Sequence, residues 1–134
     1  MERGKSGEAM AYRHLRKLGY TVVARNYRTR DGRGEVDLVA WEGEQLVFVE
    51  VKTRTREEFG APESAIDSRK RQHIIRAAED YLRRAGLERA CARFDTVSVI
   101  LRQPIEVQVR RDAFSRLSTA ATAALRKGGK SKIA

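Results

Sequence analysis

The sequence predicts one α/β domain in which a central mixed sheet is flanked by helices. Its 134 residues are typical of a single domain. The hydrophobic fraction of 41% is enough for one core and too high for a disordered chain. Helical and strand-like patterns alternate in the order helix, three strands, helix, one or two strands, which is typical of a mixed sheet covered by helices.

The first helix is expected over Gly7–Leu18, with Ser6 as its N-cap and Gly19 as its stop. Its apolar stripe, followed one turn toward the N-terminus, reaches Glu8. A carboxylate that extends a buried helix face is unusual. Glu8 is therefore a candidate functional residue.

Three strands are expected after this helix. The first is a β-branched segment at Tyr20–Ala24, and a polar turn over Asn26–Gly34 follows it. The second and third strands, Glu35–Trp41 and Gln45–Thr53, form a hairpin that turns around Gly43.

The second half of the chain is expected to hold another helix and further strands. The expected elements are a loop over Arg54–Glu63, a helix from Asp67 or Ser68 to just before Gly86, and strands over Arg93–Leu101 and Ile105–Val109. A last helix over Asp112–Leu125 and a flexible basic tail over Arg126–Ala134 complete the prediction. Residues 1–114 are thus expected to form the folded domain, and residues 115–134 a C-terminal helix and tail.

Composition and charge exclude several classes of protein. The net charge is +10, and arginine outnumbers lysine 21 to 7, which indicates either a polyanionic partner or genomic base bias. No stretch is long and apolar enough for a transmembrane helix, and the N-terminus lacks a signal-peptide core. Cys91 is the single cysteine, and His14 and His73 are far apart, which excludes an internal disulfide and a Cys/His metal cluster. A cytoplasmic protein is expected.

Both strands of the hairpin contain a carboxylate among apolar residues. If Glu42 faces Gln45 across the turn, Asp37 lies directly opposite Glu50. A three-residue turn would place Val36 there instead. We expect the first register.

Two carboxylates opposite each other have Cβ atoms about 4.5–5.5 Å apart and destabilise the sheet. Such a pair is explained by a shared proton, a cationic partner or a divalent metal. Lys52 lies on the same face as Glu50, and Glu8 adds a carboxylate from the first helix. These groups suit a magnesium-dependent phosphodiesterase. An internal salt bridge between Lys52 and Glu50, without chemistry, is the alternative.

The residues resemble two related groups of proteins. Asp37 followed by Glu50-Val51-Lys52 resembles the Asp…Glu-x-Lys core of the restriction-endonuclease-like superfamily. A closer resemblance, over about Gly7 to Phe114, is to the YraN-type family of small uncharacterised bacterial proteins, which are similar to archaeal Holliday-junction resolvases. The motifs that show it are Gly7-Glu8-Ala9, Arg25-Asn26-Tyr27, Gly34-Glu35-Val36-Asp37, Phe48-Val49-Glu50-Val51-Lys52-Thr53-Arg54, Lys70 and Arg93-Phe94-Asp95.

This resemblance implies an α-β-β-β-α-β restriction-endonuclease-like core and a site for Mg²⁺ or Mn²⁺ formed by Glu8, Asp37 and Glu50, with Lys52 as the catalytic lysine. It implies hydrolysis of phosphodiester bonds in nucleic acid, with branched or single-stranded DNA expected before RNA, and a possible homodimer. A nucleic-acid-binding module with this fold and little or no catalysis is the alternative, because fold membership does not establish activity.

Further residues near the site are candidates for outer roles. Glu35 is a candidate outer carboxylate of the metal site or a polar strand end. The candidates for contacts with nucleic acid are Tyr27, Arg28, Arg30, Arg33, Arg54 and Lys70. For each of these six residues, ordinary surface charge or packing is the alternative.

Overall fold

The computed structural model describes residues 3–55 and 68–114, with side chains from Gly7 onward. Its elements are α1 (Arg3–Lys17), β1 (Thr21–Arg28), β2 (Glu35–Glu42), β3 (Gln45–Thr55), α2 (Ser68–Ala85), β4 (Ala92–Leu101) and β5 (Glu106–Arg110), with a 3-10 turn at Arg89–Cys91. The predicted order α-β-β-β-α-β is confirmed, and β5 follows it. The fold is compatible with a restriction-endonuclease-like core.

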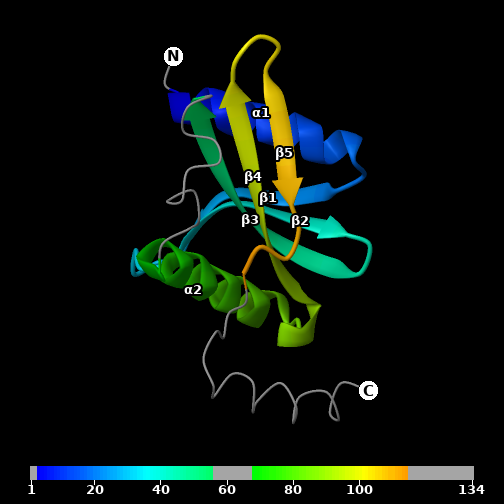
Figure 1. The fold of residues 1–134 in the computed structure, drawn as a ribbon. Helices are drawn as coiled ribbons and strands as arrows, with labels where there is room; N and C mark the ends of the chain where they lie inside the picture. The colour runs from blue at the N-terminus through cyan, green and yellow to red at the C-terminus, as the bar shows by residue number, and fades with distance from the viewer. Residues whose placement is uncertain (1–2, 56–67, 115–134) are drawn as a thin grey trace.

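The strands form one mixed sheet in the order β1-β2-β3-β4-β5. The neighbouring strands are antiparallel except for β3 and β4, which are parallel. A parallel pair requires a long crossover, and here the crossover includes α2. The two helices cover opposite faces of the sheet, and α2 lies in the lower part of the view in Figure 1.

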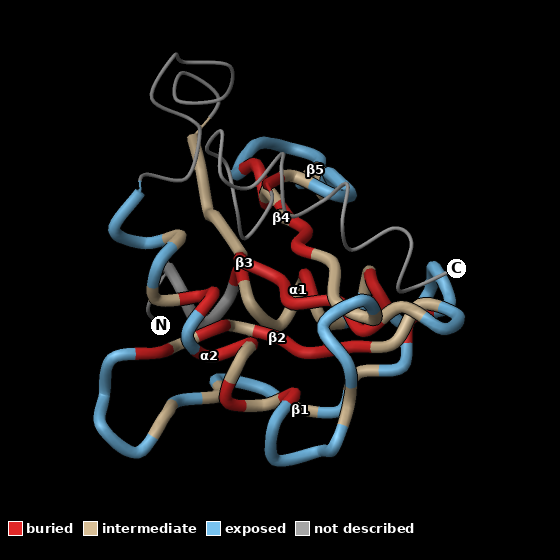
Figure 2. The backbone as a smooth tube through the Cα atoms, turned by 90° about the horizontal axis from the view of Figure 1, so that it is seen from below, coloured by how far each residue is buried: buried red, intermediate tan, exposed pale blue. Residues whose placement is uncertain are grey.

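Two hydrophobic clusters hold the helices to the sheet. On the α1 side, Ala11 and Leu15 pack against a cluster that includes Val47 and Val97. On the α2 side the buried residues are Val36, Val39, Leu46, Phe48, Ile74, Ile75, Ala77, Ala78, Leu82, Phe94 and Phe114. The central strands are buried from both faces (Figure 2), which explains their nearly continuous apolar sequences.

Two strands continue at least two residues beyond their predicted ends. β1 was expected to end at Ala24, but it continues to Arg28, because Tyr27 pairs with Val36 and Arg28 with Glu35 across the β1–β2 ladder. Tyr27 and Arg28 therefore lie in a strand and not in the polar turn. Likewise, Arg54 lies in β3 and not in a loop, since its partner in the parallel ladder is Ile100. The local sequence does not predict these extensions, because their side chains are polar. Pairing with the neighbouring strands holds them in the sheet.

The C-terminal prediction is only partly within the described residues. No helix begins at Asp112, which has a positive φ of 53°, and residues 112–114 are not helical. The remainder of the predicted last helix and the tail lie outside the described residues, as does most of the predicted loop over Arg54–Glu63. No helix within residues 3–55 and 68–114 is long and apolar enough to cross a membrane.

Candidate metal and nucleic-acid site

Strands β2 and β3 separate at the carboxylates. Their ladder runs from the hairpin turn as far as Leu38 opposite Val49, in the predicted register. Beyond that pair, the start of β2 remains paired with β1, whereas the end of β3 remains paired with β4. Asp37 and Glu50 are the next residues of the two strands, so they lie where this fork in the sheet opens.

The side chain of Asp37 reaches across the fork. Its Oδ2 accepts a hydrogen bond of 2.7 Å from the backbone N–H of Val51. Val36 packs on the α2 side and Leu38 on the α1 side, although regular alternation would put both on one face. This break in alternation at Asp37 allows its carboxylate to lie in the fork and to satisfy a strand N–H there.

Glu50 is the buried member of the pair. Only 6% of its side chain is exposed, and it forms a hydrogen bond with Asp37. Burial and the neighbouring charge of Asp37 raise the pKa of Glu50 to about 8. Lys70 Nζ, from α2, lies 3.2 Å from Glu50 Oε2. Burial and the neighbouring carboxylate therefore favour the protonated form of Glu50, and the adjacent Lys70 ammonium group opposes this shift.

Glu8 approaches the same fork from α1. A Cβ at Gly7 would overlap Oγ1 of Thr53 in β3, so glycine at this position allows the helix to lie close to the strand. Burial and the charge of Asp37 raise the pKa of Glu8, and a hydrogen bond with the side chain of Asn26 lowers it. Glu8 is half-buried near Asp37 and Asn26, and its role as a metal ligand stays a prediction.

The chemistry of these residues fits a hard divalent cation. Glu8, Asp37 and Glu50 provide carboxylate oxygens, which Mg²⁺ and Mn²⁺ prefer, and the repulsion among them is what a cation would offset. In the part of the chain that the structure describes, no group of three or more His, Cys, Asp or Glu residues is already assembled as a metal site. Lys70 provides the positive charge near Glu50 in this arrangement.

One protein-family model matches most of the described chain. The family model described as "Uncharacterised protein family UPF0102" matches residues 7–99, which include the carboxylates of the fork and most of the sheet. The chain belongs to the UPF0102 family. This confirms the predicted membership in a family of small uncharacterised proteins.

Individual UPF0102 proteins are similar over most of their length. The chain is 54% identical to the UPF0102 protein of Solibacter usitatus over 111 residues, which cover 83% of the chain and 84% of the relative. It is 44% identical to a UPF0102 protein of Koribacter versatilis over 115 residues, 85% of the chain and 80% of the relative. A UPF0102 protein of Caldicellulosiruptor saccharolyticus is 40% identical over 116 residues, 84% of the chain and 97% of the relative.

The other predicted site residues of this UPF0102 protein lie in the strands around the fork. Lys52 follows Glu50 by two positions in β3 and pairs with Ser98 of β4. Glu35 and Arg28 form an ion pair of 3.0 Å across the β1–β2 ladder, so each holds the other at the strand ends. The roles predicted for these residues and for Arg54 stay predictions.

Tyr27 connects β1 to α2. Its hydroxyl donates to Asp80, and its ring packs edge-on against Tyr81 with centroids 5.2 Å apart. Burial and the hydrogen bond to Asp80 raise the pKa of Tyr27 to about 12. The ring thus has a packing role, whereas base stacking stays a prediction. Arg30 and Arg33 lie exposed in the β1–β2 turn, as predicted.

Two groups of residues near the site were not predicted from the sequence. Asn26, which bonds to Glu8, adopts a φ of 52°, and asparagine is one of the few residues that tolerate this conformation. Its position in the Arg25-Asn26-Tyr27 motif was the feature of the sequence that could have identified it. Arginines of α2 that face the β1–β2 turn were missed because only tertiary packing brings them there.

The Arg93-Phe94-Asp95 motif has a structural role at another part of the sheet. Asp95 is fully buried and accepts hydrogen bonds from Tyr20, the Arg93 guanidinium and the backbone N–H of Asp112. Arg93 also pairs with Glu42, whose pKa is lowered to about 2 by hydrogen bonds from Arg111 and Arg93. This network joins β4 to the β2–β3 hairpin and contains no residue of the fork.

Proposed function

We propose that this UPF0102 protein is a metal-dependent nuclease that hydrolyses phosphodiester bonds in nucleic acid, with branched or single-stranded DNA as its substrate. In this proposal Glu8, Asp37 and Glu50 hold Mg²⁺ or Mn²⁺. Lys52 orients the attacking water or offsets charge at the phosphate. Glu35 supports the site from its edge.

The observation that supports this most strongly is the fork between β2 and β3. It holds two carboxylates in contact, one of them buried with a raised pKa and the other accepting a hydrogen bond from a backbone N–H. A chain under selection for stability alone gains nothing from this pair, because apolar residues would fit the surrounding core at no electrostatic cost. A binding role for the oxygens explains why two carboxylates lie together at this position.

A bound divalent cation supplies charge stabilisation at the phosphate and a nucleophilic water. The chain itself contributes the fixed carboxylates and the positive charge of nearby lysines. Lys70 is in contact with Glu50, and in the proposed complex its ammonium group turns toward the phosphate backbone where a cation takes its place beside Glu50.

A cleavage panel tests the proposal. Purified protein with Mg²⁺ or Mn²⁺ should cut at least one of a flap, a four-way junction, a single strand and an RNA. Asp37→Ala and Lys52→Ala should each lower the rate by about 100-fold or more. Glu44→Ala, a carboxylate exposed in the hairpin turn, is the matched control and should leave the rate unchanged. Absence of products from every substrate would reject the proposal.

One observation favours a second function, a nucleic-acid-binding module without catalysis. The Lys70–Glu50 ion pair offsets the buried charge without a metal. In that case binding persists in EDTA, no products form with either metal, and Asp37→Ala leaves the affinity for DNA unchanged. Self-association into a dimer, which the resemblance implies, is a separate proposal that sedimentation would test.

A further inference from the structure

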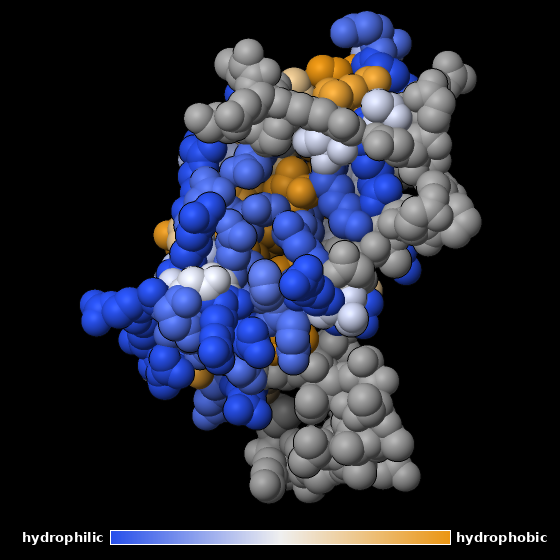
Figure 3. Space-filling view, turned by 90° about the vertical axis from the view of Figure 1, so that its left-hand side faces the viewer, coloured by the Kyte–Doolittle hydropathy of each residue, from blue (hydrophilic) through white to orange (hydrophobic). Residues whose placement is uncertain are grey.

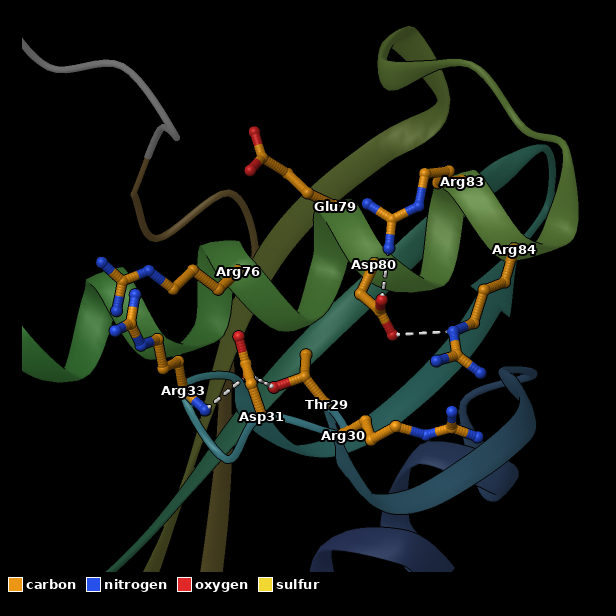
Figure 4. Close-up of a pocket in the computed structure, with 9 residues that line it drawn as sticks. All are labelled: Thr29, Arg30, Asp31, Arg33, Arg76, Glu79, Asp80, Arg83 and Arg84. Carbon is orange, nitrogen blue, oxygen red and sulfur yellow. Dashed lines mark hydrogen bonds and ion pairs between the residues drawn. The ribbon is translucent and has the colours of Figure 1, made fainter.

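A groove lined only by polar and charged residues lies between the β1–β2 turn and α2. Its volume is about 400 Å³, and five of its nine lining residues are arginines. Arg30 and Arg33 come from the turn, and Arg76, Arg83 and Arg84 from the helix (Figure 4). Small-molecule sites are mostly apolar, so this lining indicates a polyanion instead.

The packing of the turn against α2 forms the groove. A Cβ at Gly34 would lie 2.7 Å from the backbone nitrogen of Ala77 in α2, so glycine allows turn and helix to touch. The hydrogen bond from Tyr27 to Asp80 links β1 to the same helix. The two walls of the groove are therefore held at a defined separation.

Acidic residues in the groove hold some of its arginines in place. Asp80 is buried and forms ion pairs with Arg83 at 2.7 Å and with Arg84 at 3.1 Å. Asp31 accepts hydrogen bonds from Thr29 Oγ1 and from the backbone N–H of Arg33. Glu79 lies 4.0 Å from Arg89, which is not part of the lining.

The remaining arginines have no such partner. Within residues 3–55 and 68–114, no hydrogen bond or ion pair joins the guanidinium group of Arg30, Arg33 or Arg76 to a carboxylate. Arg33 and Arg76 extend toward the same end of the groove (Figure 4), and the charges of both act on Asp31. With five arginines against three carboxylates, the groove has a net positive charge.

Helix α2 connects the groove to the carboxylate fork. Lys70, which contacts Glu50, and Arg76 are six residues apart on α2, or about 9 Å along its axis. Arg84 is about 21 Å from Lys70 by the same measure. At about 3.4 Å per nucleotide of a stacked strand, these separations correspond to roughly three and six nucleotides. Hydrophilic side chains cover most of the face of the molecule that contains the start of α2 (Figure 3).

We propose that this arginine groove binds the phosphate backbone of a nucleic-acid strand on one side of the carboxylate fork, about three to six nucleotides away. The inference rests on the proposed function for the distance from the fork to the bound phosphates. The binding of phosphate by the arginines does not depend on it. Guanidinium groups form bidentate hydrogen bonds with phosphate oxygens. Asp80 orients Arg83 and Arg84 before a strand binds. The guanidinium groups of Arg33 and Arg76 replace their contacts with water by contacts with phosphate oxygens.

Strand binding in EDTA tests the groove without catalysis. The probes are fluorescein-labelled single-stranded DNAs of about 4 and about 12 nucleotides, and the readout is anisotropy across a salt series. The variant is R33Q/R76Q, since neither guanidinium forms an ion pair in the described residues. The control is R13Q/R110Q, which removes two exposed arginines of α1 and β5 and the same total charge.

The wild type should bind the longer strand more tightly than the shorter strand. R33Q/R76Q should lower affinity for the longer strand by about tenfold and reduce the slope of log affinity against log salt by about 1.4. The control should change affinity by less than about threefold. Equal losses of affinity in both double variants would overturn the proposed groove. Retention of wild-type affinity by R33Q/R76Q would overturn it as well. Thermal unfolding checks that both variants are folded.

The two proposals fail separately. If no substrate is cut but strand binding depends on Arg33 and Arg76, the groove stands and the nuclease proposal does not. If the wild type cuts DNA and R33Q/R76Q binds and cuts the longer strand like the wild type, the groove is wrong and the nuclease proposal stands.

Discussion

At the scale of single residues, Glu50 has an environment that opposes its own charge. It is buried, in contact with Asp37, and partly offset by one lysine. A carboxyl whose pKa rises on folding favours the protonated form in the native state, so its contribution to stability falls as the pH rises through that range. Ionisation of such a residue lowers the free energy of unfolding at neutral pH. A residue that lowers stability in this way is a candidate for a functional role.

Glu50→Gln tests this cost directly. The native pKa of about 8 lies above the ordinary value of 4.5 for glutamate, so ionisation of Glu50 destabilises the wild type as the pH rises between these two values, and a neutral amide has no such effect. We expect the variant to have a larger free energy of unfolding at about pH 9, by about 1–3 kcal/mol, with the difference disappearing near pH 4. Urea unfolding at both pH values measures this.

Glu44→Gln is the exposed control and should show no such pH dependence. If Glu50 acted mainly as a stabilising partner of Lys70, the variant would be less stable than the wild type at about pH 9. That outcome would contradict our interpretation of the pair.

At the scale of elements, two glycines determine how closely neighbouring segments approach the site. Gly7 lets α1 lie against Thr53 of β3, one residue before Glu8. Gly34 lets the β1–β2 turn lie against Ala77 of α2. Each glycine precedes an acidic residue of the predicted site in its motif, and neither adopts a left-handed conformation. The requirement is therefore for space and not for backbone freedom.

A double-mutant cycle at Gly7 and Thr53 tests the close approach. Gly7→Ala should destabilise the protein by about 1–3 kcal/mol, because the new methyl group overlaps Thr53 Oγ1. In the Thr53→Ala background the same substitution should cost less, so the coupling energy should be about 1 kcal/mol or more. Additive costs would show that the contact does not limit the approach. Chemical denaturation of all four proteins provides the measurement.

At the scale of the whole molecule, the site depends on all layers of the fold. α1 contributes Glu8 from one face, α2 contributes Lys70 from the other, and the sheet opens between them at Asp37 and Glu50. The fork exists only in the folded chain, so a ligand of the fork binds the native state and not the unfolded state. Its binding energy should therefore appear as global stability.

Divalent metal should raise the thermal stability of the wild type. At about tenfold excess over its Kd, Mg²⁺ or Mn²⁺ adds about 1.4 kcal/mol, which for a domain of this size is a shift in Tm of several degrees. Asp37→Asn should abolish the shift, whereas Glu44→Gln should retain it. Equal shifts in all three proteins would indicate weak binding elsewhere on the surface. Scanning calorimetry with and without EDTA measures these values.

Much of the fold and the core of the site follow from local sequence patterns. The order of helices and strands follows from hydrophobic periodicity, and the position of Asp37 relative to Glu50 follows from the parity of one short turn. These features depend on neighbours in the chain, so the sequence alone determines them. Family membership also follows from sequence, since its motifs are contiguous.

Only the tertiary structure decides how these residues are used. The separation of β2 from β3, the contact of Lys70 with Glu50 and the meeting of Arg33 with the α2 arginines all join segments far apart in the chain. The length of β1 belongs here too, because polar residues up to Arg28 remain in the strand through pairing with β2. Local periodicity contains no information about such contacts, since their energy arises only when the helices pack on the sheet.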